Sequence, residues 1–359
     1  MPAMWWKAAL VVLAIAAAAV PVPPSVIEAL YSNRVFPILQ PLVTGFSNLV
    51  PFALFDVLLA CAAIVLVARI IADVRLKRRA GWGPALGRFV QRLVLVAAGA
   101  YLLFLLLWGF NYRRVPMTGK VQFDAARVSP EAARALAQTT VDRVNALYGA
   151  AHQEGWLPAG TVDPRLADAF ARMRAELAIR GVLRPGRPKR TLLDPYFRRA
   201  GVAGMTDPYF LETFVVSDLL PFERPAVIAH EWSHLAGIAD EGDANFTAWL
   251  TCLRGSPAHQ YSGWLFLYDE VAGTLPPSAL RQVVASLNEG PRADLRAIRD
   301  RLQRQINPAI SAAGWRVYDS YLKANQVEQG AASYAEVVRL ILGTTFEGDW
   351  VPRLADVQR

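Results

Sequence analysis

One run of 18 residues, from Leu93 to Phe110, carries no charge and is the clearest candidate in the chain for a membrane span. A helix needs about 20 apolar residues to cross the hydrocarbon core of a bilayer, so this run has nearly the required length. Two other runs have the same character, and 54% of the whole chain is hydrophobic. We therefore expect residues 1–110 to form a membrane region with hydrophobic segments at about 8–22, 51–70 and 93–110.

The first of these segments is short, because its apolar core covers only the 13 residues from Ala8 to Val20. A core of this length suits a short anchor or the centre of a signal peptide. The prolines that follow, at positions 21, 23 and 24, are unusual for a cleavage site, which favours an uncleaved anchor.

The basic residues predict how the membrane region is oriented. The stretch at 72–92 and its flank carry seven basic residues against the single acid Asp73: Arg69, Arg75, Lys77, Arg78, Arg79, Arg88 and Arg92. By the positive-inside rule this loop lies in the cytoplasm, and the two charges of Arg113 and Arg114 do not outweigh it. We expect a multi-pass protein of the bacterial inner (cytoplasmic) membrane, with residues 22–50 and the C-terminal domain, 111–359, outside the cytoplasm.

The net charge of +8 does not indicate a nucleic-acid partner. Seven of the positive charges belong to the predicted cytoplasmic loop, where they contact anionic lipid, so the expected partner is the lipid bilayer. Asp56 is an acid inside the second hydrophobic segment, but it follows Pro51 closely and is expected near the outer interface, where water reaches it. Cys61 and Cys252 fall on either side of the predicted membrane boundary, so no disulfide is expected.

The motif HEWSH, from His230 to His234, is typical of a zinc site. Residues four apart on a helix project from one face, so both imidazoles can reach one Zn²⁺. Glu231 lies beside them, where it can act as general base toward a zinc-bound water. The chain has only four histidines, and two of them fall in this motif. The alternative is a buried helix whose histidines only make hydrogen bonds.

A third ligand is expected just after the turn at Gly237, where three acids occur. Glu241 begins an apolar stretch with the character of a helix. It is favoured because residues 241–245 resemble the E-x-x-A-D helix of membrane zinc peptidases, whose glutamate binds the metal. Asp240, six residues after His234, is second, and Asp243 is third; capping a helix N-terminus explains at least two of the three acids. Asn245 shares a helix face with Glu241 and could orient a ligating histidine.

Most of residues 111–359 are expected to be helical. The helical periodicity is seen in five stretches besides the motif: 129–148, 164–180, 277–287, 292–306 and 333–342. Residues 183–199 are basic and contain proline, which predicts an exposed loop. Tyr209 to Val216 mixes aromatic and β-branched residues, which is typical of a strand. A strand there at a sheet edge could bind a peptide substrate through its backbone; the alternative is a buried strand or the start of a helix.

Metal-dependent hydrolysis also requires a donor for the developing oxyanion. By residue type alone His259, Tyr261, Tyr321 and Tyr334 are eligible, although a structural role is expected more often for each. Cys252 is expected to be a small buried residue.

The chain resembles a bacterial membrane-protein family of unknown function that pairs N-terminal spans with an HExxH domain. The resemblance rests on HEWSHLAGIADEGDANF at 230–246, QYSG at 260–263 and YLKANQVEQGAASY at 321–334. In that family a glutamate usually precedes the Ala-Asn pair, whereas Asp243 stands here. Residues 241–245 are also similar to the E-x-x-A-D helix of membrane zinc peptidases. The resemblance implies a zincin-like domain and, by analogy, a hydrolase.

These observations predict a membrane-anchored zinc metallopeptidase that hydrolyses envelope proteins or peptides. His230, His234 and Glu241 would bind Zn²⁺, and Glu231 would be the catalytic residue. The alternative is a non-catalytic zinc-binding membrane protein with a structural or partner-binding role. A transporter or sensor ranks last, because three spans with one marginal acid offer little for a substrate pathway.

Overall fold

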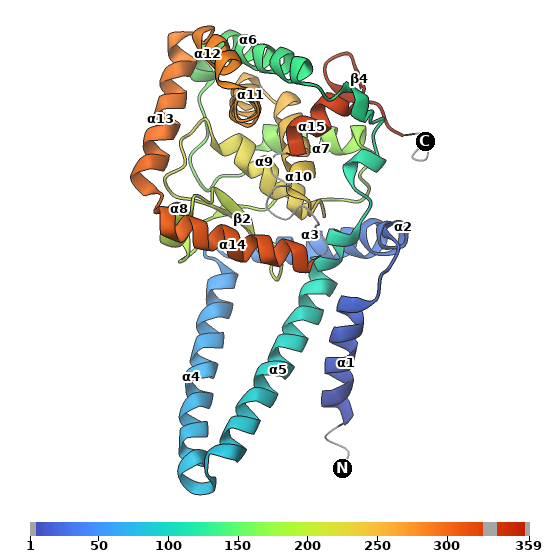
Figure 1. The fold of residues 1–359 in the computed structure, drawn as a ribbon, viewed down its shortest axis with the longest axis vertical. Coiled ribbons are helices and arrows are strands. Elements are labelled where there is room, and N and C mark those ends of the chain that lie inside the picture. The colour runs from blue at the N-terminus through green and yellow to red at the C-terminus, as the bar shows by residue number, and fades with distance from the viewer. Residues whose placement is uncertain (1–4, 326–335, 356–359) are drawn as a thin grey trace.

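The computed structural model describes residues 5–325 and 336–355, and it is mainly helical, as predicted. Long helices extend from one side of a helical domain (Figure 1). Two helices in the described residues are long and apolar enough to cross a membrane, α4 (Leu54–Ala80) and α5 (Trp82–Leu107). These two candidate spans contain the second and third predicted segments.

The basic stretch at 72–92, predicted to be a loop, is helical almost throughout. Helix α4 continues to Ala80 and α5 begins at Trp82, so only Gly81 connects them. Gly81 has φ +85°, a left-handed conformation that glycine adopts at no steric cost. Lysine and arginine are good helix formers, so the basic residues extend both helices beyond their apolar parts.

The first predicted segment is not a straight span of its own. Helix α1 (Trp5–Ala19) has 15 residues, fewer than the roughly 20 needed to cross a bilayer. The chain then bends by 116° into residues 24–47, which comprise α2 (Pro24–Ile27), the π-helix η1 (Glu28–Val35) and α3 (Phe36–Ser47). This pair is either a broken span or a re-entrant segment.

Helix α3 is amphipathic, but its polar face points toward the protein and its apolar face points outward, the reverse of a surface helix on a soluble protein. Its polar side is buried: Gln40 Nε2 donates to Arg184 O over 2.8 Å, and Thr44 Oγ1 donates to Leu211 O over 3.0 Å. The outward side of α3 and the turn after it exposes large apolar side chains: Ile38, Leu42, Phe46 and Leu49. An apolar face turned away from the protein suits contact with lipid.

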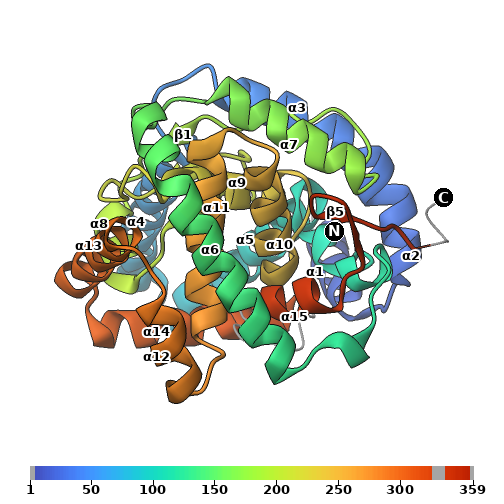
Figure 2. The ribbon, with the colours of Figure 1, turned by 90° about the horizontal axis from the view of Figure 1, so that it is seen from above.

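The helical domain is built around three central helices, α9 (Arg224–Leu235), α10 (Glu241–Leu253) and α11 (Pro257–Ala272). Helix α6 (Pro130–Glu154) packs along α11, as seen from above in Figure 2. The core between them is aromatic, with Trp232, Trp249 and Trp264 almost fully buried. The remaining helices surround this core: α7 (Pro164–Glu176), α8 (Asp194–Ala200), α12 (Pro277–Ala285), α13 (Glu289–Gln305), α14 (Pro308–Ala324) and α15 (Glu336–Gly343), with the 3₁₀ turns η2 (Gly109–Arg113), η3 (Met117–Gly119) and η4 (Ala125–Arg127).

The five predicted helices are present, with ends that differ from the prediction. Ser129 caps α6, accepting a hydrogen bond from Ala132 N, but α6 continues past Gly149 to Glu154 and ends before Gly155, whose φ is +74°. Helix α7 ends at Glu176, short of the predicted 180. The predicted start of the last helix, Ser333, lies outside the described residues.

The strands are short, and they correct two predictions. Strand β3 (Thr213–Val215) lies within the predicted strand but is central, paired in parallel with β1 (Pro188–Lys189) and antiparallel with β2 (Gly204–Thr206). Strands β1 and β2 are therefore the two edges of this sheet. The predicted loop at 183–199 contains β1 and the start of α8, and its Lys189 is buried. A second pair, β4 (Phe346–Glu347) and β5 (Val351–Pro352), lies near the C-terminus.

Candidate metal centre

A tight turn folds α10 back beside α9 and brings the predicted ligands together. Pro225 lies in the first turn of α9, where its missing N–H costs no helical hydrogen bond. The helix ends at Leu235, Gly237 follows with a left-handed φ of +75°, and Ile238 N donates back to Ser233 O over 3.0 Å. A Cβ at Gly237 would lie 2.8 Å from Asn111 Oδ1, so both conformation and space require glycine here.

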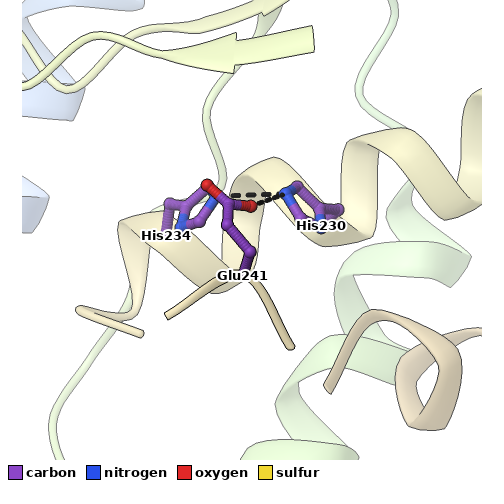
Figure 3. A group of neighbouring side chains, drawn as sticks. All are labelled: His230, His234 and Glu241. Carbon is purple, nitrogen blue, oxygen red and sulfur yellow. Dashed lines mark hydrogen bonds and ion pairs between the residues drawn. The ribbon is translucent and has the colours of Figure 1, made fainter. Parts of the chain in front are cut away.

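His230, His234 and Glu241 converge on one point (Figure 3). The two imidazole Nε2 atoms are 3.0 Å apart, and Glu241 Oε2 lies 3.1 Å from that of His230 and 3.5 Å from that of His234. Ligand atoms about 2.1 Å from a shared ion at tetrahedral angles lie roughly 3.3 Å from one another. The spacing of these three atoms therefore fits a zinc ion, and the donor set of two imidazoles and a carboxylate is a common one for zinc.

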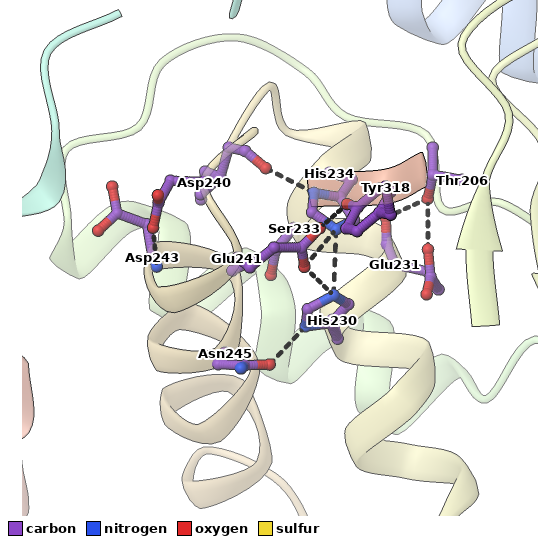
Figure 4. A network of polar contacts seen from close by, with 12 residues as sticks. Thr206, His230, Glu231, Ser233, His234, Asp240, Glu241, Asp243, Asn245 and Tyr318 are labelled. Atoms are coloured by element: carbon purple, nitrogen blue, oxygen red, sulfur yellow. Dashed lines mark hydrogen bonds and ion pairs between the residues drawn. The ribbon is translucent and has the colours of Figure 1, made fainter. Parts of the chain in front are cut away.

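Hydrogen bonds on the far side of each ring orient the imidazoles (Figure 4). His234 Nδ1 donates to the backbone oxygen of Ile238 over 2.7 Å, which turns its Nε2 toward Glu241. His230 Nδ1 lies 2.7 Å from Asn245 Oδ1, so the predicted contact with Asn245 is confirmed. Partners of this kind fix the tautomer and direction of a ligating histidine.

Glu241 is buried in a position that requires a positive charge nearby. Its Oε2 accepts no hydrogen bond from the described residues, although it faces both Nε2 atoms. Burial raises the pKa of Glu241, but the charge interactions with His234 and His230 outweigh burial and lower it. Burial lowers the pKa of His234, but Glu241 reverses this effect and raises that pKa to about 9. The three atoms therefore favour a cation, either a proton or a metal ion, between them.

Glu231 is buried beside this cluster and is not part of it. Thr206 Oγ1 donates to its Oε2 over 2.8 Å (Figure 4). Burial raises the pKa of the Glu231 carboxyl, although the two imidazoles and Thr206 act in the opposite direction. Strand β2 passes directly over this side chain, since a Cβ on Gly204 would lie 2.5 Å from Glu231 Oε1.

The two other acids after the turn have structural roles. Asp240 is the N-cap of α10, where its Oδ1 accepts from Asp243 N over 3.0 Å. Asp243 Oδ2 accepts from Met117 N over 2.8 Å, which attaches the start of η3 to α10. Neither carboxylate belongs to the His230, His234 and Glu241 group.

Two of the four candidate oxyanion donors lie in the core away from the cluster. His259 closes the capping box of α11 and contacts Asp163 at 3.0 Å, and Tyr261 donates to Asp294 over 2.6 Å. Tyr321 borders the cavity beside the metal centre, whereas Tyr334 lies outside the described residues.

Tyr318 was missed in the sequence and contacts the cluster directly, because its hydroxyl donates to Glu241 Oε1. It precedes Tyr321 by three positions, so both lie on one face of α14. This spacing of two tyrosines could have indicated that Tyr318 faces the same site as Tyr321.

The cluster opens into a cavity of about 830 Å³. His230, Glu231, His234 and Glu241 border it at one end, and its other walls are largely apolar. They come from α5, α8, β2 and α14, with Phe55 from α4: Phe104, Phe197, Met205, Tyr209, Trp315 and Val317 are among the larger side chains.

Residues 31–342 match the model of a family described as "Protein of unknown function (DUF3810)". The chain belongs to this family. The matched range includes both candidate spans, the metal centre and α14. The predicted membership of a family of unknown function is thereby confirmed. No curated protein and no solved structure matches the chain. Because the family description names no activity, function has to be argued from the site.

Proposed function

We propose that this protein is a membrane-anchored zinc metallopeptidase with a zincin-like catalytic domain. The proposal rests on one observation: three side chains converge as possible zinc ligands, and a buried glutamate lies beside them without joining them. His230, His234 and Glu241 form a ligand set, and Glu231 lies beside them without joining it. A structural zinc site has no use for a second buried carboxylate beside its ligands, whereas hydrolysis needs one to move a proton.

In this proposal Glu231 moves a proton. Bound zinc would supply Lewis acidity, which polarises the substrate carbonyl and makes water more acidic. Glu231 accepts the proton of the attacking water on a carboxylate oxygen and returns it to the leaving amine nitrogen. Thr206 holds the carboxylate, and the raised pKa of Glu231 brings it nearer to neutrality, where both transfers are efficient.

The free edge of β2 supports a peptide as the substrate. At the two ends of β2, Asp207 N donates to Glu212 O and Val216 N donates to Ala203 O. In an antiparallel pair every second residue forms hydrogen bonds with the partner strand, so the backbone groups of Met205 also face β3. The N–H and C=O groups of Gly204 and Thr206 then face the opposite way. None of them has a hydrogen-bond partner outside the sheet in the described part of the chain. An extended peptide could pair with them directly above Glu231.

The proposed location is the bacterial inner membrane, with the catalytic domain outside the cytoplasm. This orientation rests on the basic residues around Gly81, which joins the two candidate spans at the end away from the domain (Figure 1). Substrates would then be proteins or peptides of the cell envelope.

The test compares the purified protein with its Glu231→Gln variant on a peptide library made from bacterial envelope proteins, with cleavage read by mass spectrometry. We expect the variant to keep its zinc and lose at least about 100-fold in cleavage rate, the lower end of the range for general acid–base catalysis. Glu131→Gln, an exposed position in the first turn of α6, is the matched control and should change neither. Equal cleavage by Glu231→Gln and the unchanged protein would favour the alternative, a non-catalytic zinc protein.

A further inference from the structure

The cavity beside the metal centre continues down the side of a candidate membrane span. Ala97, Ala100, Tyr101 and Phe104 line it from one face of α5. Ala97 precedes the end of α5 at Leu107 by ten residues, which corresponds to about 15 Å along the helix. A cavity that begins at the ligands of the domain therefore reaches well into the segment expected to lie in the bilayer.

Both candidate spans contribute side chains to the wall of this cavity. Helices α4 and α5 meet at Gly81 and diverge toward the domain (Figure 1). Phe55, near the start of α4, lines the cavity opposite α5. Helix α14 forms another wall, where the Tyr321 ring centroid lies 6.2 Å from that of Phe104.

Apolar side chains at the base of the domain place the cavity mouth at the membrane surface. The outward face of α3 is apolar, as described above, and α14 exposes Val317, with 72% of its surface accessible. Leu192, just before α8, is 80% exposed. Three separate elements thus present apolar residues at the end where the spans leave the domain, which suits contact with the hydrophobic part of a bilayer.

We propose that the metal centre takes its substrate from the bilayer: a polypeptide that leaves a membrane-embedded apolar segment, enters between α4 and α5, and pairs with β2. This inference rests on the proposed function and specifies its substrate class. The apolar walls along α5 would receive the part of the substrate nearest the membrane. The unpaired backbone groups of Gly204 and Thr206 favour a polypeptide over a lipid, because an acyl chain has no hydrogen-bonding groups to offer them.

The experiment uses full-length Glu231→Gln protein in liposomes of phosphatidylethanolamine and phosphatidylglycerol. The probe is a synthetic peptide with about 20 leucine and alanine residues, long enough to span the bilayer, and a polar tail with a photoreactive diazirine at its start. We expect cross-links to β2 and α14, mapped by mass spectrometry. The polar tail alone should cross-link less by about tenfold, equivalent to about 1.4 kcal/mol of binding free energy.

Ala100→Trp should fill the membrane end of the cavity and lower cross-linking of the anchored peptide by a similar factor. Val96→Trp, which faces outward from α5 and does not line the cavity, is the matched control and should leave cross-linking unchanged. Zinc content reports whether each variant is folded, and the comparison of anchored with tail-only peptide needs no substitution in α5.

Equal cross-linking of the two peptides would overturn the inference, because it would show access from water. Cross-linking at β2 by a diazirine phospholipid but not by the anchored peptide would also overturn it, since a lipid would then be the occupant. Binding to Glu231→Gln does not require hydrolysis. A protein that captures the anchored peptide but whose unchanged form cleaves nothing would therefore contradict the proposed function and leave the route of entry standing.

Discussion

The indole Nε1 of Trp108 donates a hydrogen bond of 2.9 Å to the backbone oxygen of His234. Trp108 directly follows α5, and its ring also meets the His234 imidazole edge-on, with centroids 6.0 Å apart. A candidate membrane span therefore ends against one of the three proposed zinc ligands. The candidate metal centre and the candidate spans are joined by packing as well as by the chain.

Trp108→Phe tests how much this hydrogen bond contributes. The variant keeps an aromatic ring beside His234 but loses the N–H, so we expect the free energy of unfolding to fall by about 1 kcal/mol. Trp108→Ala also removes the ring and should cost about 3–5 kcal/mol. Unfolding in detergent measures both, with Trp82→Phe, an exposed ring at the other end of α5, as the control. Equal stability of Trp108→Phe and the unchanged protein would show that the bond contributes nothing.

Metal content distinguishes the three acids after Gly237. We expect about one zinc per chain in the purified protein, as a single three-ligand site requires. His230→Ala and Glu241→Ala each remove a converging ligand and should abolish it. Asp240→Ala and Asp243→Ala should retain zinc, because both carboxylates accept hydrogen bonds from backbone N–H groups instead. Loss of zinc in Asp240→Ala alone would reassign the third ligand.

Asn245→Ala should weaken zinc binding without abolishing it. Its amide oxygen fixes the ring of His230, and loss of such partners commonly costs about 10–100-fold in metal affinity. Competition with a chelator of known affinity measures the change. Asn145→Ala, whose amide donates to Ser286 O on the far side of the domain, is the matched control. An affinity equal to that of the control would mean that Asn245 does not support the ligand.

The convergence of His230, His234 and Glu241 could be predicted because these residues are close in sequence. Seven positions separate His234 from Glu241, and Gly237 between them predicts the turn that returns the chain. The two candidate spans could also be predicted, since an apolar run of sufficient length is recognised directly from the sequence. The bend after the short first segment was not predicted, because the pattern of apolar residues does not indicate the direction of the chain beyond Ala19.

The surroundings of the site depend on contacts that no local pattern contains. Trp108 and His234 are 126 positions apart, and Tyr318 and Glu241 are 77 apart. Such pairs are determined by how whole helices pack. Strand β2 is the sequence Gly-Met-Thr and lacks the aromatic and β-branched run that marks residues 209–216, so the edge strand was predicted at β3 instead.

A buried ion pair connects the base of α4 to the domain, and its loss should be costly. Lys189 Nζ lies 2.6 Å from Glu212 Oε1, with side chains only 1% and 0% exposed. The two Glu212 oxygens also accept from Leu54 N at 3.1 Å and Phe55 N at 3.0 Å, at the first turn of α4. The carboxylate therefore binds both the lysine and the positive end of α4, a candidate membrane span.

Lys189→Met leaves this carboxylate buried without its cation, and we expect a loss of about 3–5 kcal/mol in the free energy of unfolding. Glu212→Gln should cost a similar amount, because it leaves the ammonium unpaired. The double variant should cost less than the two single losses together, since neither charge then remains uncompensated. Lys323→Met breaks an exposed pair with Asp319, 55% and 32% accessible, and should cost about 1 kcal/mol or less. If Lys189→Met proved as mild as Lys323→Met, the pair would not be what attaches α4 to the domain.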